Sequence, residues 1–120
     1  MNKIRGIRGA ITVTGNNKGQ IVTSTEGLLR KMVGINKIKV DDIASIIFSI
    51  TRDLNAEFPA IAARNLGWIH TPLMCTYEMD VPGSVRRCIR VLMHMNSNKA
   101  QSSIKHVYLR NAKKLRPDLG

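Results

Sequence analysis

Arginines dominate the residues of this chain that are suited to binding a charged molecule. Four of them fall at positions expected to lie in strands or helices: Arg8, Arg64, Arg90 and Arg116. A guanidinium group binds a carboxylate through two parallel hydrogen bonds. Together with Glu78 and Tyr108, these arginines suit a small ligand that carries several carboxylates. They do not suit acid–base catalysis, which requires a group that titrates near neutral pH.

Arg90 is the most unusual of these residues, because it lies in an apolar segment. Residues 85–95 alternate along a predicted strand, with Ile89, Val91, Met93 and Met95 on one face and Cys88, Arg90, Leu92 and His94 on the other. A buried guanidinium without a partner would cost about 3–5 kcal/mol. We therefore expect an anion beside it, either a protein carboxylate such as Glu78 in a structural ion pair or an anionic ligand.

Other catalytic arrangements are missing from the sequence. It contains no glycine-rich phosphate loop, no pair of histidines with metal-ligand spacing and no Gly-x-Ser-x-Gly turn. We expect His70, His94 and His106 to be surface or packing residues, and we predict no metal site. Cys75 is a poor candidate for a nucleophile, because nothing near it in the sequence would lower its pKa.

Length and composition predict a single domain over residues 1–120. The chain is 43% hydrophobic but only 4% aromatic, so Ile, Val, Leu and six Met must fill the core. A core this small is often supplemented by oligomerisation. Two cysteines without metal spacing favour a reducing cytoplasm, and we expect neither a signal peptide nor a membrane span.

The net charge is +11, from 19 Lys and Arg against 8 Asp and Glu. Such an excess favours anionic partners. The basic residues are scattered, however, and few aromatic side chains are available to stack on bases. We expect weak, salt-dependent adherence to nucleic acid and no specific nucleic-acid partner.

Periodicity and turn residues predict the elements that must position these side chains. We predict strands at residues 4–13, 43–50, within 68–77, at 85–95 and at 104–109, a helix at 20–33 ended by Gly34, and a short helix at 58–66 ended by Gly67. Pro72 restricts where the strand within 68–77 can begin. Residues 80–84 form a turn, and the chain beyond 109 is strand or irregular. Strand 43–50 is apolar enough to be buried on both faces, and the long helix before it predicts a crossover between parallel strands. The result is an α+β domain with one long helix on a mixed five-stranded sheet.

Arg8 lies between Gly6 and Ala10 on one face of the first predicted strand. These small neighbours leave open space beside the guanidinium, which suits the close approach of a ligand. The alternative is a solvent-facing arginine on an edge strand.

Five blocks of sequence, taken together, indicate a family. They are IRGIRGA at 4–10, DLNAEFPA at 53–60, CTYEMDV at 75–81, CIRVLM at 88–93, and HVYL at 106–109 followed by LRPDL at 115–119. In order and spacing they resemble the AroH-class chorismate mutases over nearly the whole chain. The resemblance implies a homotrimer whose sheets pack into a pseudo-α/β barrel, with three sites in clefts between subunits. It also implies the rearrangement of chorismate to prephenate, without cofactor or metal.

The resemblance also implies roles for individual residues. Arg90 would stabilise negative charge on the ether oxygen of chorismate, and Glu78 would accept a hydrogen bond from the ring hydroxyl. Arg8 and Tyr108 would hold the enolpyruvyl carboxylate. The predicted substrate site is completed by Phe58, Arg64, Cys75, Leu115 and Arg116.

Two positions depart from the family pattern. Ile61 stands where a lysine is common, and Arg52 stands where a proline is common. A second architecture remains as an alternative, a RidA-like trimer that binds small ligands or deaminates imines. It would use similar clefts between subunits with a different set of polar residues.

Overall fold

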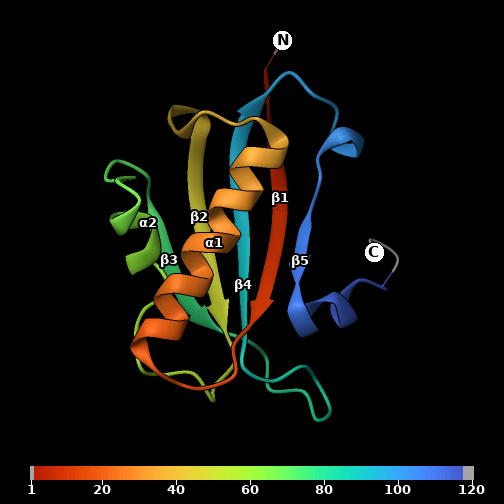
Figure 1. The fold of residues 1–120 in the computed structure, drawn as a ribbon. Helices are drawn as coiled ribbons and strands as arrows, with labels where there is room; N and C mark the ends of the chain where they lie inside the picture. The colour runs from red at the N-terminus through yellow and green to blue at the C-terminus, as the bar shows by residue number, and fades with distance from the viewer. Residues whose placement is uncertain (1, 118–120) are drawn as a thin grey trace.

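Five strands form one mixed sheet in the computed structural model, which describes residues 2–117 (Figure 1). The strands are β1 (Lys3–Thr12), β2 (Ile43–Ile50), β3 (Leu73–Tyr77), β4 (Cys88–Ser97) and β5 (Val107–Leu109). The helices are α1 (Lys18–Asn36) and α2 (Ile61–Asn65), with 3-10 turns at Val40–Asp42, Gln101–Ser103 and Arg110–Leu115. The predicted α+β class is confirmed. Within residues 2–117, no helix is long and apolar enough to cross a membrane.

The strands lie in the order β3-β2-β4-β1-β5, so β4 is central. It pairs antiparallel with β1 and β2, whereas β5 joins β1 and β3 joins β2 in parallel. β1 and β2 are therefore parallel, as predicted for strands joined by a crossover helix. The strands on either side of the turn at residues 80–84 are not neighbours, because β2 lies between them.

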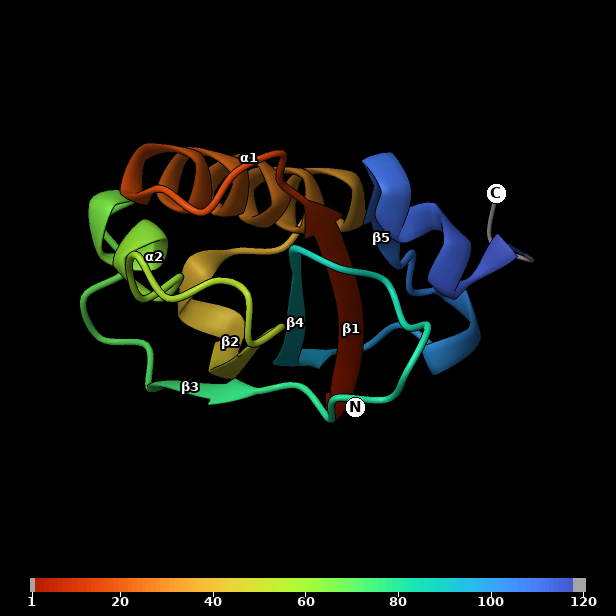
Figure 2. The same ribbon diagram turned by 90° about the horizontal axis from the view of Figure 1, so that it is seen from below.

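Helix α1 covers one face of the sheet, and α2 packs beside it (Figure 2). Residues of α1 that are fully buried follow the spacing of an amphipathic helix: Ile21, Leu28, Leu29 and Met32. Within the described residues, neither of the two α-helices covers the opposite face. The core of the single chain is therefore one layer of helix on one layer of sheet.

Side-chain hydrogen bonds fix both ends of α1. Asn17 caps its start by accepting a hydrogen bond from the backbone N–H of Gln20 at 2.8 Å. The predicted stop at Gly34 is wrong, because the helix continues to Asn36. The buried amide of Asn36 donates to the carbonyl of Lys105 at 2.8 Å, and its oxygen accepts from the N–H of the same residue. These bonds to a segment far away in the sequence hold the last turn of α1 in place.

The face of the sheet away from α1 is open. In β2, Ile46, Phe48 and Ile50 are buried, whereas Ser45, Ile47 and Ser49 are partly exposed. The prediction that this strand is buried on both faces is therefore wrong for the single chain.

The alternation predicted for β4 is confirmed, with one exception. The four side chains beneath α1 are buried, and Arg90 and Leu92 on the other face are exposed. The exception is Cys88, which lies on the open face but is buried in a small cluster with Ala10 and Ala112.

Several predicted boundaries differ from those in the structure, among them the starts of β4 and β5, which lie at Cys88 and Val107 rather than at 85 and 104. The short helix α2 spans Ile61–Asn65 rather than 58–66, because residues 58–60 form the turn that leads into it. β3 begins at Leu73, directly after Pro72, which agrees with the expectation that this proline limits where the strand can start. Beyond β5 the chain is neither strand nor irregular. Arg110 adopts a φ of 55° and starts a 3-10 helix that buries Ala112.

Gly9 in β1 lies where α1 comes closest to the sheet. A Cβ at this position would lie 2.5 Å from the Sδ of Met32 and 3.2 Å from the Cδ1 of Leu28. We expect Gly9→Ala to lower the free energy of unfolding by about 1–3 kcal/mol, as overpacking does, which urea titration measures. Gly27→Ala is the matched control, because its Cβ would meet open space on α1, and it should gain up to about 1 kcal/mol. A Gly9→Ala protein as stable as the wild type would contradict the close contact.

Candidate active site

A cavity of about 360 Å³ opens on the face of the sheet that α1 leaves uncovered. Six of the nine predicted site residues line it: Arg8, Glu78, Arg90, Tyr108, Leu115 and Arg116. They come from β1, β4, β5, the segment after β3 and the end of the last 3-10 helix. The fold thus brings together residues that lie far apart in the sequence.

The register of the sheet explains why Arg90 has room. Its neighbours across the sheet are Ala10 on β1 and Ser49 on β2, both of which are small. Ala10 also pairs with Tyr108 on β5, and Arg8 lies two residues before it on the same face. Arg8, Arg90 and Tyr108 therefore surround a position that only a methyl group occupies.

Arg90 has the anionic partner that its position requires. Its Nε lies 3.0 Å from Oε1 of Glu78, and their side chains are 45% and 22% exposed. Glu78 is held in place because its N–H donates to the carbonyl of Ile50 at 2.8 Å, which extends the pairing of β2 and β3. The ion pair borders the cavity. Arg90 therefore has a protein carboxylate as its partner and is also accessible to a ligand in the cavity.

The chain beyond β5 is anchored beneath the cavity by the small cluster around Cys88. Tyr108 and Leu115 pack against the buried Ala10, Cys88 and Ala112. Burial raises the pKa of the Cys88 thiol to about 11, against the opposing effect of the nearby Arg90 guanidinium. This thiol therefore stays protonated at neutral pH and serves as packing.

The cavity carries more positive than negative charge. Arg8, Arg90 and Arg116 line it against one carboxylate, that of Glu78. The pKa of the nearby His106 is lowered by burial and then by the charges of Arg8 and Arg116. Within residues 2–117, no three His, Cys, Asp or Glu side chains are grouped so that they could hold a metal ion. The arrangement suits an anion with several acidic groups.

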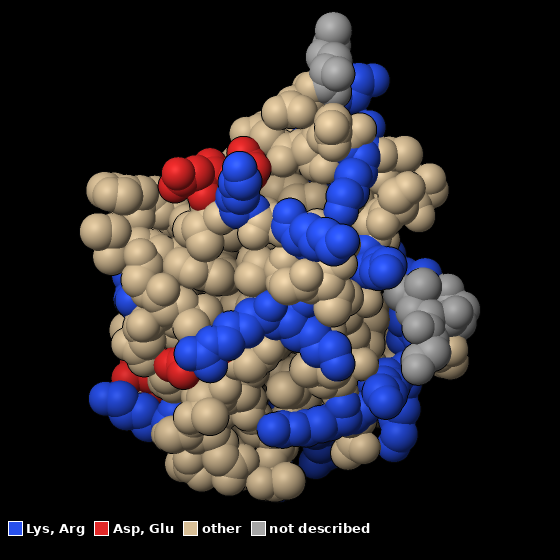
Figure 3. All heavy atoms as spheres, turned by 45° about the horizontal axis from the view of Figure 1, so that its top comes forward, with Lys and Arg blue, Asp and Glu red and all other residues tan. Residues whose placement is uncertain are grey.

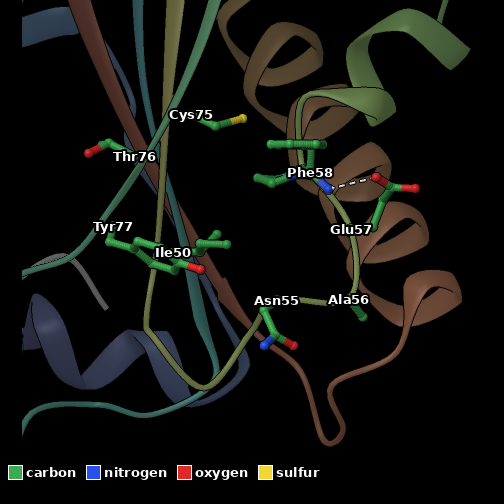
Figure 4. A pocket seen from close by; sticks show the side chains of 9 residues that line it. Ile50, Asn55, Ala56, Glu57, Phe58, Cys75, Thr76 and Tyr77 are labelled. Atoms are coloured by element: carbon green, nitrogen blue, oxygen red, sulfur yellow. Dashed lines mark hydrogen bonds between the residues drawn. The ribbon is translucent and has the colours of Figure 1, made fainter.

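Phe58 and Cys75 do not join this cavity in the single chain. They line a second pocket of about 310 Å³, where Cys75 points from β3 toward the exposed ring of Phe58 (Figure 4). Cys75 pairs with the buried Phe48, so it faces the α1 side of the sheet, away from Arg90. Burial raises the pKa of its thiol, which agrees with the prediction that it is a poor nucleophile.

Arg64 lines neither of these two pockets. It lies on α2 and its Nη1 donates to the carbonyl of Ile69 at 2.8 Å. Conversely, Ile47 and Ser49 line the cavity but were not predicted to do so. The sequence of β2 could have indicated this, because Ser45 and Ser49 share a face with Ile47 and make that face more polar than the other.

A model of the chorismate mutase type I family matches residues 4–119. The chain belongs to this family. Chorismate mutase AroH of Bacillus subtilis (strain 168) is 45% identical over 117 residues, which cover 97% of this chain and 92% of that protein. Chorismate mutase AroH of Thermus thermophilus is 47% identical over 117 residues, covering 97% and 96%. The solved structure of a chorismate mutase from Clostridium thermocellum matches with a TM-score of 0.90 and 56% identity, covering 91% of this chain and 97% of that chain.

Membership in the chorismate mutase type I family confirms the resemblance read from the sequence, and the RidA-like alternative is not supported. The roles of individual residues remain predictions. Of the two departures, Ile61 is the partly buried first residue of α2, and the guanidinium of Arg52 lies 5.2 Å from the ring centre of Tyr77. Residues 118 and 119 of the last block lie outside the described residues.

Proposed function

We propose that this member of the chorismate mutase type I family is an isomerase that converts chorismate to prephenate in the cavity beside Arg90. The observation that carries the proposal is the grouping of three guanidinium groups and one carboxylate around a single cavity. Chorismate carries two carboxylates, so its binding calls for an excess of positive charge. The family match over residues 4–119 supports the same reaction.

Arg90 and Glu78 act on the reacting part of the substrate. The ether C–O bond breaks while a C–C bond forms within the same molecule, and the ether oxygen gains negative charge in the transition state. A guanidinium fixed beside that oxygen stabilises the transition state more than the substrate. The 3.0 Å contact with Glu78 supplies the fixing, and the Glu78 carboxylate accepts a hydrogen bond from the ring hydroxyl.

The remaining residues of the cavity hold the substrate in its compact reactive conformer. Arg8 and Tyr108 bind the enolpyruvyl carboxylate, and Arg116 lies at the mouth near the ring carboxylate. Leu115 covers the apolar part of the ring. Fixing a flexible molecule in one conformer contributes to the rate because its entropy is lost on binding rather than during the reaction. The step requires no cofactor or metal.

The enzyme works as a homotrimer with its sites between subunits. Two features support this proposal. The open face of the sheet exposes apolar side chains, with Ile4 and Met74 each 64% exposed. In addition, Phe58, Arg64 and Cys75 do not line the cavity of their own chain, which fits their being supplied by a neighbouring subunit. The sheets then pack into a shared barrel that covers the open face.

Two further proposals concern the setting of the reaction. Both cysteines are free thiols, which supports a reducing compartment, the cytoplasm. On the face that Figure 3 shows, Lys and Arg side chains lie across the middle and the right of the view and are not confined to one groove. We expect nucleic acid to bind weakly, without sequence preference, and to be released by salt.

The test is direct. Purified protein mixed with chorismate should remove the ultraviolet absorbance of that substrate, and prephenate should form in equal amount. Chorismate that stays unchanged under conditions in which the relative from Bacillus subtilis is active would overturn the proposed function.

A further inference from the structure

The outer edge of β1 is completed mainly by side chains. β5 pairs with only three of its residues, Gly9 to Ile11. Before that stretch, Gln101 bonds Gly6 twice, accepting from its N–H at 2.9 Å and donating to its carbonyl at 2.7 Å. Next along the edge, Nδ1 of His106 accepts the N–H of Arg8 at 2.9 Å. These three side-chain bonds take the place of strand pairing along this part of the edge.

The bond from His106 reaches the backbone of a cavity residue. The N–H of Arg8 points to the edge of the sheet, while its side chain lines the cavity. His106 is followed two residues later by Tyr108, which lines the same cavity from β5. One hydrogen bond therefore sets the spacing between the two residues that are expected to hold one substrate carboxylate.

This bond requires a neutral imidazole whose proton is on Nε2. A protonated imidazole donates from both nitrogens and cannot accept the N–H of Arg8. The charged groups that act on His106 are Arg8 on β1 and Arg116 after the last 3-10 helix, and with burial they lower its pKa from the usual 6.5. Its surroundings thus favour the form that the bond needs.

We propose that neutral His106 is a positioning residue of the substrate site, which holds Arg8 at the correct distance from Tyr108 through the backbone of β1. The proposal rests on the function proposed above. His106 does not touch the substrate, so it acts only through Arg8. Protonation breaks the bond and adds a third positive charge beside Arg8 and Arg116.

A dependence on pH follows with a definite sign. Because the pKa of His106 is lower in the folded protein, the unfolded chain takes up this proton first as the pH falls. The free energy of unfolding therefore decreases as the pH drops below about 6.5, down to the pKa of the folded form. Affinity for chorismate should fall in the acid range as the folded form is protonated.

Three variants test the proposal by steady-state kinetics across pH. His106→Ala removes the acceptor and should lower kcat/KM about tenfold, mostly through KM, as the loss of one hydrogen bond predicts. His106→Asn places a non-titrating oxygen near the position of Nδ1. This variant should restore kcat/KM to within about threefold of wild type, and its affinity for chorismate should no longer fall at acid pH. Gln101→Ala is the matched control, because it removes two bonds to the same edge at Gly6, and it should stay close to wild type.

Nitrogen NMR of His106 adds a readout that does not depend on turnover, and it should show an unprotonated Nδ1 at neutral pH. A protonated Nδ1, an active His106→Ala protein with unchanged KM, or a Gln101→Ala protein with an equal loss would each overturn the role of His106. A wild-type protein that shows the expected tautomer but does not convert chorismate would overturn the proposed function, and with it the role of His106 in that site.

Discussion

Replacing Arg90 with alanine is expected to lower kcat for chorismate about 10³-fold, with a similar fall in kcat/KM. The guanidinium lines the cavity and is fixed by Glu78 at 3.0 Å. Its interaction with the ether oxygen is strong only in the transition state, so its removal should act on kcat more than on KM. The loss of chorismate absorbance under saturating substrate measures this effect.

Two control variants separate charge, geometry and folding. Arg90→Lys keeps the positive charge but loses the fork of donors, so its activity should lie between wild type and Arg90→Ala. Arg30→Ala removes an exposed arginine from α1, outside the cavity, and should leave kcat unchanged. Thermal unfolding of each protein shows whether the fold is intact. An Arg90→Ala protein that is folded and fully active would refute the proposed mechanism.

Placing a carboxylate on the open face of the sheet at Ile4 is expected to split the proposed trimer and lower turnover by about 10²-fold or more. Ile4 is 64% exposed in the single chain and lies on the same face of β1 as Arg8. If subunits pack on this face, Ile4→Glu would bury an unpaired charge. Monomers would then lack Phe58 and Arg64 in each cavity. Sedimentation velocity measures the mass of the same samples that are assayed.

Ile35→Glu is the matched control for this change. Ile35 is 38% exposed on α1, away from the open face, so this variant should remain trimeric and active. Trimeric and fully active Ile4→Glu protein would show that this face is not an interface.

Refolding a mixture of Arg90→Ala and Arg64→Ala chains tests the shared site more sharply. In mixed trimers, some sites would receive both intact arginines from different subunits, so part of the activity should return. If each site belonged to one chain, mixing would restore nothing.

Much of this fold was predictable because strand and helix periodicity depend on local sequence. Residues 43–50 were placed as observed, and so were the two faces of the strand that holds Arg90. The errors lie where contacts between distant parts of the sequence determine the local structure. Gly34 does not end α1, because Asn36 bonds to the backbone of Lys105, just before β5. The 3-10 helix at residues 110–115 depends on the burial of Ala112 against β1 and β4, which no local pattern reveals.

The site shows the same division. The resemblance located Arg8, Glu78, Arg90 and Tyr108, and the register of the sheet brings them together. The hydrogen bond that His106 accepts from Arg8 was not predicted, because a histidine that accepts a backbone hydrogen bond has no signature in the sequence. The sequence left open which chain supplies Phe58 and Cys75. In the single chain they lie apart from the cavity, because Cys75 occupies the α1 side of β3 and Phe58 lies in the turn before α2.

The open face of the sheet affects measurements of the thermal stability of this protein. In the proposed trimer each chain completes its core only on contact with its neighbours, so folding is coupled to association and the apparent stability follows mass action. The midpoint of thermal unfolding should rise with protein concentration, and strong dilution should lower it. Unfolding data from this protein are therefore comparable only at matched concentrations of subunits.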